Sequence, residues 1–550
     1  MGGGPARHHR GRRRHGRPDA GRRPGRGPAC GHLPVPAARH GPGLLCRAGA
    51  ADAPRPPGCP GLSDRALCRR SRDPGRGRRR QAAAAVRAHG RGRPVPGADR
   101  PGRATDRHRL PALDPLHQAL GATVTAWRNW SGLHQANPAV IFSPVEETGI
   151  VAAVREAKAR GLTLRVVGSG HSFTPLCVTD SAHISLAGHS GVVAVEGEQA
   201  TVKAGTTIRA LGPLLRERGL SLANQGDIDA QAIAGAIGTG THGTGVGLGS
   251  IASQATALRL VTASGDIVSC SATVESDVFN AARVAMGSMG ILSEVTLACR
   301  PAYTLHERQR GMALDEVLAT FPDFAQAHRH AEFFWFPLSQ AAVVKTLDPT
   351  DAPVSKALAL HHFKTSVVEN GALWAFAQAS RLIPALTGPL ARLSAAAGSS
   401  EKIDYAERTF PSSRSVRFNE MEYAVPAQAG LECIAEIRAW FQRTGTRIYF
   451  PIEFRYVAAD DIWLSPFEGR DCAAIAVHRL AGEDFTAYFA AMEAIFRNHQ
   501  GRPHWGKLHT LKAADLAALY PHWHDFQTVR RRLDPDGLFL NDYLRDLFEE

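Results

Sequence analysis

The first 123 residues lack seven residue types altogether: Ile, Phe, Tyr, Trp, Asn, Lys and Glu. This segment holds 27 Arg and 7 Asp, a net charge of +20, whereas the whole 550-residue chain carries +14, so residues 124–550 carry −6. A segment without large apolar side chains cannot bury enough surface to offset the entropy of the chain. We therefore predict that residues 1–123 are disordered and that the basic character is confined to them.

Three interpretations of this leader stay open. An Arg/Gly-rich tail binds nucleic acid through phosphate charge. An Arg-rich, acid-poor leader is typical of a transit peptide, although its Pro and Gly density disfavours an amphipathic helix. The third, which we favour, is translation of GC-rich DNA upstream of the natural start, because most of the missing residue types have AT-rich codons. Val124 is then a candidate start position.

Paired cysteines and long apolar runs are also missing. The cysteines beyond the leader are isolated, without a CxxC pair, which excludes a disulfide framework and a thiolate zinc site. The sequence has neither an HExxH motif nor a GxSxG elbow, so we predict no metal site and no serine nucleophile of that type. No run approaches the ~18 apolar residues of a membrane span, and the prediction for localisation is the cytoplasm.

A β-α-β unit opens the part of the chain with globular composition. Val140–Phe142 predicts a strand, and Ser143–Glu146 a capping box that begins a helix with Pro at its first position. Leu162–Val167 predicts the next strand. The unit therefore places Gly168–His171 at the carboxyl end of a strand, where α/β proteins commonly bind ligands.

Two glycine-rich blocks are candidate phosphate cradles. Gly168 and Gly170 have no Cβ, so the backbone can turn sharply and point N–H groups at an anion such as a pyrophosphate. Gly238–Gly243 formally fits GxGxxG, but it has no strand before it and no helix after it, so we reject a nicotinamide-type fingerprint. Its backbone N–H groups and Thr hydroxyls still suit phosphates.

Alternating and amphipathic patterns predict the remaining elements. We predict strands at 182–186, 191–196, 200–204, 258–263, 267–270 and 293–298, with helices at 207–218 and 277–285. Beyond residue 306 we predict an antiparallel sheet with helices on one face, from strands at 343–344, 420–425, 447–456 and 473–477 and helices at 428–443, 484–498 and near 512–532.

Glu453 and Arg455 occupy alternate positions of a predicted strand, so both side chains share one face of the sheet. A functional pair and an ordinary surface ion pair are about equally good interpretations of this spacing, since surface pairs contribute only ~0–1 kcal/mol. Lys507 likewise fits either a site or a solvated loop.

Taken together, these motifs resemble the vanillyl-alcohol-oxidase-type flavoproteins, and within them the sugar-lactone oxidases that act on L-gulonolactone and D-arabinono-1,4-lactone, with alditol oxidases close by. The resemblance covers roughly residues 127–550. The stretches that carry it are Gly168–Ser172, Gly238–Gly245, Phe418–Tyr423, Glu453–Arg455, His504–Lys507 and Phe539–Leu544.

The resemblance implies an α+β fold, with a two-part FAD-binding domain of the PCMH type and a substrate domain of antiparallel sheet and flanking helices. The expected divisions are 1–123 for the leader, 124–305 for the FAD-binding domain, 306–500 for the substrate domain and 501–550 for a C-terminal segment that returns to the flavin.

The resemblance also implies which residues bind FAD. His171 matches the histidine that many members bond covalently to the flavin, and a neutral imidazole nitrogen suits that attack. The residues expected to bind the cofactor are Val167, Gly168, Ser169, Gly170, His171, Ser172, Phe173, Gly226, Asp227, Gly235, Thr239, Gly240, Thr241, His242, Gly243 and Ile291.

Glu453, Arg455 and Lys507 fall where the family has its polar substrate site. Arg455 and Lys507 are expected to stabilise substrate oxygens and developing negative charge. Glu453 is expected to orient the cation or the substrate hydroxyl, and His478 is a weaker candidate for the same pocket. Which group acts as the base stays open at this point.

The implied activity is oxidation of a CH–OH group in a sugar-1,4-lactone by FAD, with O2 as acceptor and hydrogen peroxide as product. Gly226 matches a small residue that decides oxygen access, and Asp227 follows it where relatives often have Ser or Ala. The alternatives are an alditol oxidase, a lactone dehydrogenase with another acceptor, and a nucleic-acid-binding protein driven by the leader. For the folded region we predict no nucleic acid partner.

Overall fold

The computed structural model describes residues 126–356, 358, 370–396, 399–412, 414 and 416–549. All of them belong to one compact unit, Leu110–Glu550. The basic leader and Val124 lie outside the described residues, so their disorder and origin stay predictions. Among the described residues, no helix combines the length and the apolar character that a membrane crossing requires.

A small parallel sheet contains the predicted β-α-β unit. Its strands pair in the order β3-β5-β4, so β5 lies between the two strands that α1 connects. The turn Gly168–His171 follows the carboxyl end of β4, as predicted. The bounds are β3 Val140–Phe142, α1 Glu147–Ala159, β4 Leu164–Val167 and β5 Ala182–Ser185.

The predicted capping box at Ser143–Glu146 is wrong, because α1 begins only at Glu147 and Glu146 makes no side-chain cap. The Glu146 carboxylate lies 3.2 Å from the Lys203 Nζ, and the Glu147 carboxylate lies 2.7 Å from the Arg259 Nε. These tertiary ion pairs occupy the carboxylates that would otherwise fold back on the helix start.

An antiparallel sheet of five described strands, in the order β10-β9-β11-β7-β6, packs beside the first one. The predicted strands and both predicted helices of this region are confirmed within a few residues. The sheet strands are β6 Val192–Glu196, β7 Gln199–Lys203, β9 Ala255–Val261, β10 Ile267–Ser271 and β11 Ile291–Ala298. The helices are α2 Ile208–Arg216, α3 Ile233–Gly238, η2 Ala252–Gln254 and α4 Ser276–Ala282, and two short strand pairs are β1 Trp127–Arg128 with β2 Gln135–Ala136 and β8 Leu220–Ser221 with β12 Arg300–Pro301.

A larger antiparallel sheet of eight described strands has the order β16-β13-β15-β14-β18-β19-β17-β20. Its strands are β13 Thr304–Ala313, β14 His330–Trp335, β15 Ala341–Thr350, β16 Ser400–Tyr405, β17 Phe418–Pro426, β18 Ile452–Val457, β19 Cys472–Leu480 and β20 Arg502–Pro503. The helices of this region are α5 Leu314–Gln326, α7 Asn370–Leu382, η4 Pro384–Leu386, α8 Thr387–Ala396, α9 Ala406–Thr409, η5 Ala427–Ala429, α10 Gly430–Thr444 and α11 Thr486–Asn498.

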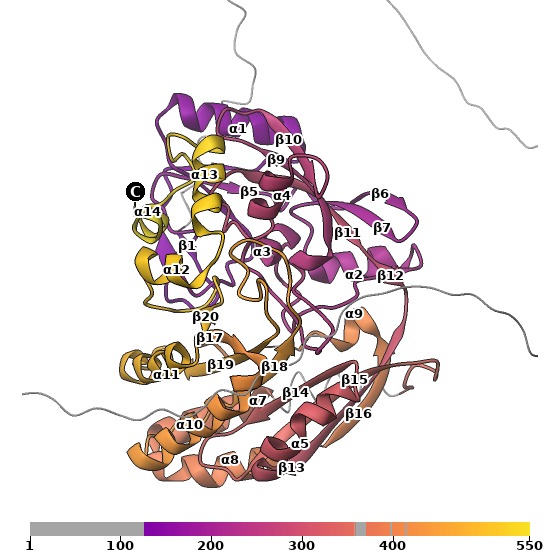
Figure 1. The fold of residues 1–550 in the computed structure, drawn as a ribbon, viewed down its shortest axis with the longest axis vertical. Helices are drawn as coiled ribbons and strands as arrows, with labels where there is room; N and C mark the ends of the chain where they lie inside the picture. The colour runs from indigo at the N-terminus through magenta and orange to yellow at the C-terminus, as the bar shows by residue number, and fades with distance from the viewer. Residues whose placement is uncertain are drawn as a thin grey trace, which may run out of the picture. The chain divides into compact units, whose positions relative to one another are not determined.

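One face of this large sheet is apolar and covered by helices, as predicted. Figure 1 shows α5, α8 and α10 along one side of the sheet. Phe454 of β18 points to that side, where its ring meets Phe321 of α5 at a centroid distance of 5.6 Å and packs closely on Gly430 of α10. The opposite face is therefore free to carry polar side chains.

The C-terminal segment contains α12 Ala513–Leu519, α13 Trp523–Leu533 and α14 Asp542–Phe548. The predicted continuous helix near 512–532 is wrong, because Pro521 lacks an N–H and its ring clashes with the preceding turn. The segment returns to β4, where the Leu164 N–H donates to the Leu538 carbonyl at 2.9 Å. It therefore packs against the amino end of β4, the strand that carries the glycine turn.

Candidate functional site

The glycine turn after β4 lines a cavity of ≈ 380 Å³. That volume lies within the ~300–1,000 Å³ usual for small-molecule sites. Gly170 has φ +69, a left-handed conformation that L side chains rarely adopt, and its carbonyl accepts the Trp130 N–H at 2.7 Å. A Cβ built on Gly235 across the cavity meets no atom within 4 Å, so that glycine leaves the space open.

The structure brings half of the predicted cofactor residues to this first cavity. They are Val167, Gly168, Ser169, Gly170, His171, Ser172, Gly235 and Thr239. Exposed backbone amides in a glycine turn and an open, small-residue wall are what an anionic dinucleotide needs. The residues present therefore fit FAD.

A second, smaller cavity of ≈ 80 Å³ adjoins the first. Four residues line both: His171, Ser172, Gln231 and Thr239. Of the other predicted cofactor residues, Phe173, Gly226, Asp227, Thr241 and His242 line the second cavity. All three predicted catalytic residues, Glu453, Arg455 and Lys507, line it as well, together with the weaker candidate His478.

Three of the predicted cofactor residues, all of them described by the structure, line neither cavity: Gly240, Gly243 and Ile291. Gly243 has a packing role, since a Cβ there would lie 2.4 Å from the Asn224 Oδ1. Ile291 is fully buried in the core at the start of β11. Their predicted contact with the cofactor stays a prediction.

His171 lies at the boundary between the two cavities. Its ring stacks on Trp130, with centroids 5.5 Å apart and an angle of 23° between the planes. Burial, helped by the nearby Lys507 cation, lowers the pKa of His171 to about 4. The imidazole is therefore neutral at ordinary pH, with a lone pair on one ring nitrogen.

Glu453 and Arg455 do share one face of β18, as their spacing predicts. The surface-pair interpretation is wrong, because the two residues are only 5% and 8% exposed. The intervening Phe454 faces the helices, so period-two geometry sends the charged side chains into the cavity.

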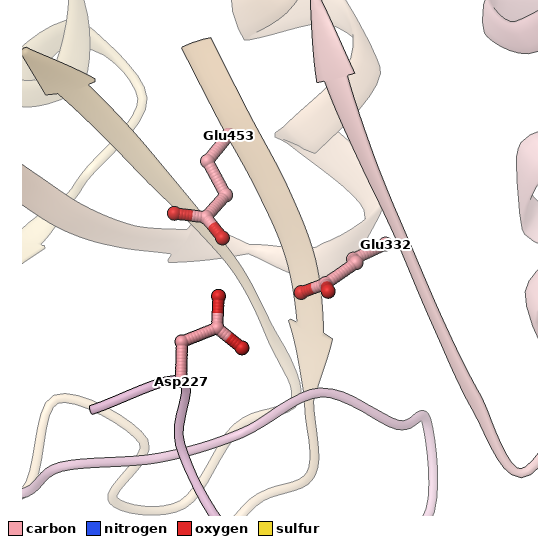
Figure 2. A group of neighbouring side chains, drawn as sticks. All are labelled: Asp227, Glu332 and Glu453. Carbon is pink, nitrogen blue, oxygen red and sulfur yellow. The ribbon is translucent and has the colours of Figure 1, made fainter. Parts of the chain in front are cut away.

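Arg455 is held by carboxylates from three segments of the chain. Its Nε donates to Glu332 of β14 at 2.7 Å, and its Nη2 donates to Asp227, on the loop between β8 and α3, at 2.7 Å. The same Nη2 contacts Glu453. Figure 2 shows the three carboxylates directed toward a common centre.

These three carboxylates have the spacing of a metal site, with oxygens within 4.8 Å of one another. However, the Arg455 guanidinium pairs with all three, and the Lys345 Nζ lies 2.9 Å from Glu332. Two protein cations thus already supply the positive charge that a metal ion would bring. The absence of a metal at this cluster stays a prediction.

The same network gives Asp227 and Glu453 very different pKa values. Burial alone would raise the pKa of Asp227, but the charges of Arg455, Lys345 and Arg414 outweigh it and lower the pKa to about 2. Burial raises the pKa of Glu453 to about 7 against the attraction of Arg455, and the nearby Asp227 and Glu332 carboxylates reinforce the rise. Glu453 therefore exchanges a proton near neutral pH.

Lys507 lies on the other side of the second cavity. Its Nζ is 2.5 Å from the Glu420 carboxylate and 5.1 Å from the centre of the Phe173 ring. Burial opposes ionisation of Glu420, but Lys507 and His478 outweigh it and lower the pKa of Glu420 to about 2. The His478 Nδ1–H donates to the Pro451 carbonyl at 3.0 Å, which leaves its Nε2 toward Glu420 at 3.5 Å.

A third buried pair joins His242 of the second glycine block to Glu422 of β17. The Nε2 of His242 lies 2.7 Å from the Glu422 carboxylate, and its Nδ1 lies 2.8 Å from the Gly243 carbonyl. Both ring nitrogens of His242 therefore face oxygen atoms of the protein. Nearby His504 has its pKa lowered to about 4 by burial.

Sequence reasoning missed several residues of this site: Trp130, Gln231, Glu332, Lys345, Arg414, Glu420 and Glu422. Glu420 and Glu422 had a signal, since they alternate on a strand as Glu453 and Arg455 do. Glu332 is an isolated acid within an apolar strand, which is also a recognisable signal. Arg414 and Gln231 lie on loops and had none.

Comparisons with known proteins show which family the chain belongs to. Residues 295–547 match the family model described as D-arabinono-1,4-lactone oxidase, and residues 138–271 match the model described as FAD binding domain. The chain is 41% identical over 422 residues to an L-gulono-1,4-lactone dehydrogenase of Mycobacterium tuberculosis, covering 76% of this chain and 98% of that protein.

More distant relatives and solved structures extend the match. An L-gulonolactone oxidase of Scyliorhinus torazame is 31% identical, over 77% of this chain and 98% of that protein. The crystal structure of a cholesterol oxidase from B. sterolicum superposes with a TM-score of 0.64 at 18% identity, over 77% of this chain and 96% of that one, which supports the fold alone. The predicted α+β fold and the predicted resemblance are thereby confirmed, and the chain belongs to the sugar-1,4-lactone oxidase group of the vanillyl-alcohol-oxidase-type, FAD-dependent oxidoreductases.

Proposed function

We propose that this protein oxidises a CH–OH group of a sugar-1,4-lactone of the D-arabinono or L-gulono type. One observation carries the proposal: the glycine-lined cavity and the charged cavity share His171, Ser172, Gln231 and Thr239. A cofactor in the first cavity and a polyhydroxylated substrate in the second would therefore meet at a common boundary. Bound FAD supplies the acceptor for the hydride that leaves the substrate carbon.

The domain division of the sequence analysis fits this proposal. Residues 124–305 would hold FAD, chiefly through the backbone of the turn Gly168–His171 and the wall that includes Gly235. Residues 306–500 would bind the lactone on the polar face of the large sheet. Residues 501–550 would add Lys507 to the substrate site and pack against β4.

Arg455 and Lys507 are the cations for the substrate oxygens in this proposal. Both line the second cavity, and each is anchored by carboxylates that fix its position before substrate arrives. Cations held in this way stabilise negative charge without reorganising as it develops. Two cations in one cavity also suit a substrate that is rich in hydroxyl and carbonyl oxygens.

Glu453 is our candidate for the group that takes the hydroxyl proton. Its pKa of about 7 matches a base that operates near neutral pH. Glu420, whose pKa is about 2, is too weak a base for that role. The Nε2 of His478 is the second candidate, since its Nδ1–H is committed to the Pro451 carbonyl.

His171 is our candidate for a covalent link to FAD. The supporting observations are its place at the boundary of both cavities and its neutral imidazole, whose pKa burial lowers to about 4. A neutral nitrogen keeps the lone pair that forms such a bond.

Molecular oxygen is the acceptor that we propose for the electrons, with hydrogen peroxide as product. The sequence-based hypothesis assigns oxygen access to Gly226, and this residue lines the second cavity beside the predicted substrate residues. A lactone dehydrogenase with another acceptor is the second candidate, because the relative at 41% identity is named a dehydrogenase. An alditol oxidase is the alternative for the substrate.

A substrate and acceptor panel tests the proposal. Purified protein is mixed with sugar-1,4-lactones, alditols and 2-hydroxy acids, while oxygen uptake, peroxide and reduction of an artificial dye are followed in parallel. Flavin bleaching by a lactone under anaerobic conditions supports the assignment. Bleaching by alditols alone would replace the substrate class, and dye reduction without oxygen uptake would replace the acceptor.

A further inference from the structure

Asp227 is the acidic residue that follows Gly226, and its carboxylate forms ion pairs with three cations. The carboxylate lies 2.7 Å from the Arg455 Nη2, 3.2 Å from the Arg414 Nη2 and 3.9 Å from the Lys345 Nζ. These cations come from β18, from the loop that precedes β17 and from β15. No other carboxylate that the structure describes in this cluster pairs with all three.

The loop that carries Asp227 is itself held tightly. The Asp227 carbonyl accepts the Ser412 N–H at 3.0 Å. Gly226 packs so closely on the neighbouring glycine block that a Cβ there would lie 2.9 Å from the His242 carbonyl oxygen. The Asp227 carboxylate is therefore a fixed anchor, since its backbone is restrained on both sides.

Arg455 donates hydrogen bonds to carboxylates from two different nitrogens. Glu332 accepts from the Nε and Asp227 from the Nη2, each at 2.7 Å. Because the guanidinium is planar, two acceptors on different nitrogens define both its position and its plane. Without Asp227, the Nη2 would keep only its contact with Glu453.

We propose that Asp227 is a positioning residue of the substrate site, which fixes the Arg455 guanidinium beside Glu453 from the Gly226 loop. The inference deepens the proposed function and rests on it for its kinetic consequences. It also changes the expected role of Asp227, whose carboxylate faces the cations of the large sheet instead of the first cavity.

The charges around Glu453 set the consequence for its ionisation. The groups that act on it most directly are Arg455 on its own strand, Asp227, Glu332 of β14 and Arg414. The other charged or titratable groups that line the same cavity are His171, His242, Glu420, Glu422, His478, His504 and Lys507. Removing the negative charge of Asp227 removes a like charge and releases Arg455 toward Glu453, and both changes lower the pKa of Glu453.

The test compares the flavin-bound wild-type enzyme with D227N, which keeps the shape and removes the charge. Infrared spectra across pH 4–9 follow the carbonyl band of the protonated Glu453 carboxyl, identified by its absence in E453Q. We expect the midpoint to fall by about one pH unit or more in D227N. Anaerobic reduction of the flavin by a lactone should slow about 10- to 100-fold, because Arg455 is displaced.

E493Q is the matched control. Glu493 is a buried carboxylate that accepts from the Tyr423 hydroxyl at 2.5 Å and from the Thr510 N–H at 2.7 Å, away from both cavities. Its loss should lower the melting temperature and leave the Glu453 midpoint unchanged. If Asp227 had a purely structural role, D227N should likewise melt at a lower temperature and leave the Glu453 midpoint unchanged.

The outcomes separate this inference from the proposed function. The infrared titration needs no substrate, so a wild-type enzyme inert toward lactones would refute the function and still leave the Asp227 test valid. A Glu453 midpoint in D227N equal to that of the wild type overturns the inference. D227S is the second variant, and if neither variant folds with flavin bound, Asp227 is a structural carboxylate and the inference is wrong.

Discussion

The imidazole of His171 lies against the indole of Trp130, with ring centroids 5.5 Å apart and planes inclined by 23°. The two segments are joined by the hydrogen bond from the Trp130 N–H to the Gly170 carbonyl, 2.7 Å long. The ring is therefore held in one place at the boundary of the two cavities. A fixed, neutral imidazole is the arrangement that a covalent flavin link requires.

The first prediction concerns that link. H171A should bind FAD through the unchanged glycine turn but release it on acid precipitation, whereas the wild-type polypeptide should keep its flavin fluorescence in a denaturing gel. H499A is the control, because His499 pairs with Glu436 at 2.9 Å outside both cavities. Covalent flavin in H171A, or free flavin in the wild type, would contradict the proposal.

The second prediction concerns the pH dependence of substrate oxidation. Burial raises the pKa of Glu453 to about 7, so the carboxyl is protonated below that pH and cannot accept a proton. Anaerobic flavin reduction by a lactone should therefore rise with pH and level off above about 7. E453Q should be slower by about 10²- to 10⁴-fold and should lose this limb of the profile. A limb near pH 7 that persists in E453Q would show that Glu453 is not the group that causes it.

The third prediction compares two lysine pairs. K507M should lower kcat/KM about 10²- to 10³-fold, because the site loses a preorganised cation. It should also destabilise the fold by about 1–3 kcal/mol, since it leaves the buried Glu420 carboxylate without its closest partner. K512M removes a lysine from the exposed pair with Asp546 and should change stability by no more than about 1 kcal/mol.

Stopped-flow kinetics and thermal denaturation of both lysine variants check this prediction. The double variant K507M/E420Q should regain stability, because the unpaired charge is gone, while its activity stays low. Recovery of activity in the double variant would show that Lys507 serves only to neutralise Glu420.

The fourth prediction concerns oxygen access at Gly226. The sequence-based hypothesis is that G226V slows reoxidation of the reduced flavin by O2 and spares its reduction by substrate. G226V should also destabilise the fold and melt at a lower temperature, because even a Cβ at this position would lie 2.9 Å from the His242 carbonyl oxygen. G247A is the control, since a Cβ at Gly247 meets no atom within 4 Å. Equal reoxidation rates in G226V and wild type would remove Gly226 from any role in oxygen access.

Local patterns were sufficient to predict much of the site. The glycine turn after β4 follows from the run of strand formers that ends at Gly168, and period-two alternation places Glu453 and Arg455 on one face. Both depend on neighbours in the chain, which is why they could be predicted. The capping box at Ser143–Glu146 failed for the converse reason, because Lys203 and Arg259 are distant in sequence and take up the carboxylates near the helix start.

The sequence by itself determined the family, the turn that carries His171 and the strand that presents Arg455, since these depend on short-range geometry and residue type. Only the tertiary structure decided how Arg455 is held. Its partners Glu332 and Asp227 lie 123 and 228 residues away along the chain. Contacts over such separations exist only once the strands are in register and the Gly226 loop packs against them, and they set the different acidities of Asp227 and Glu453.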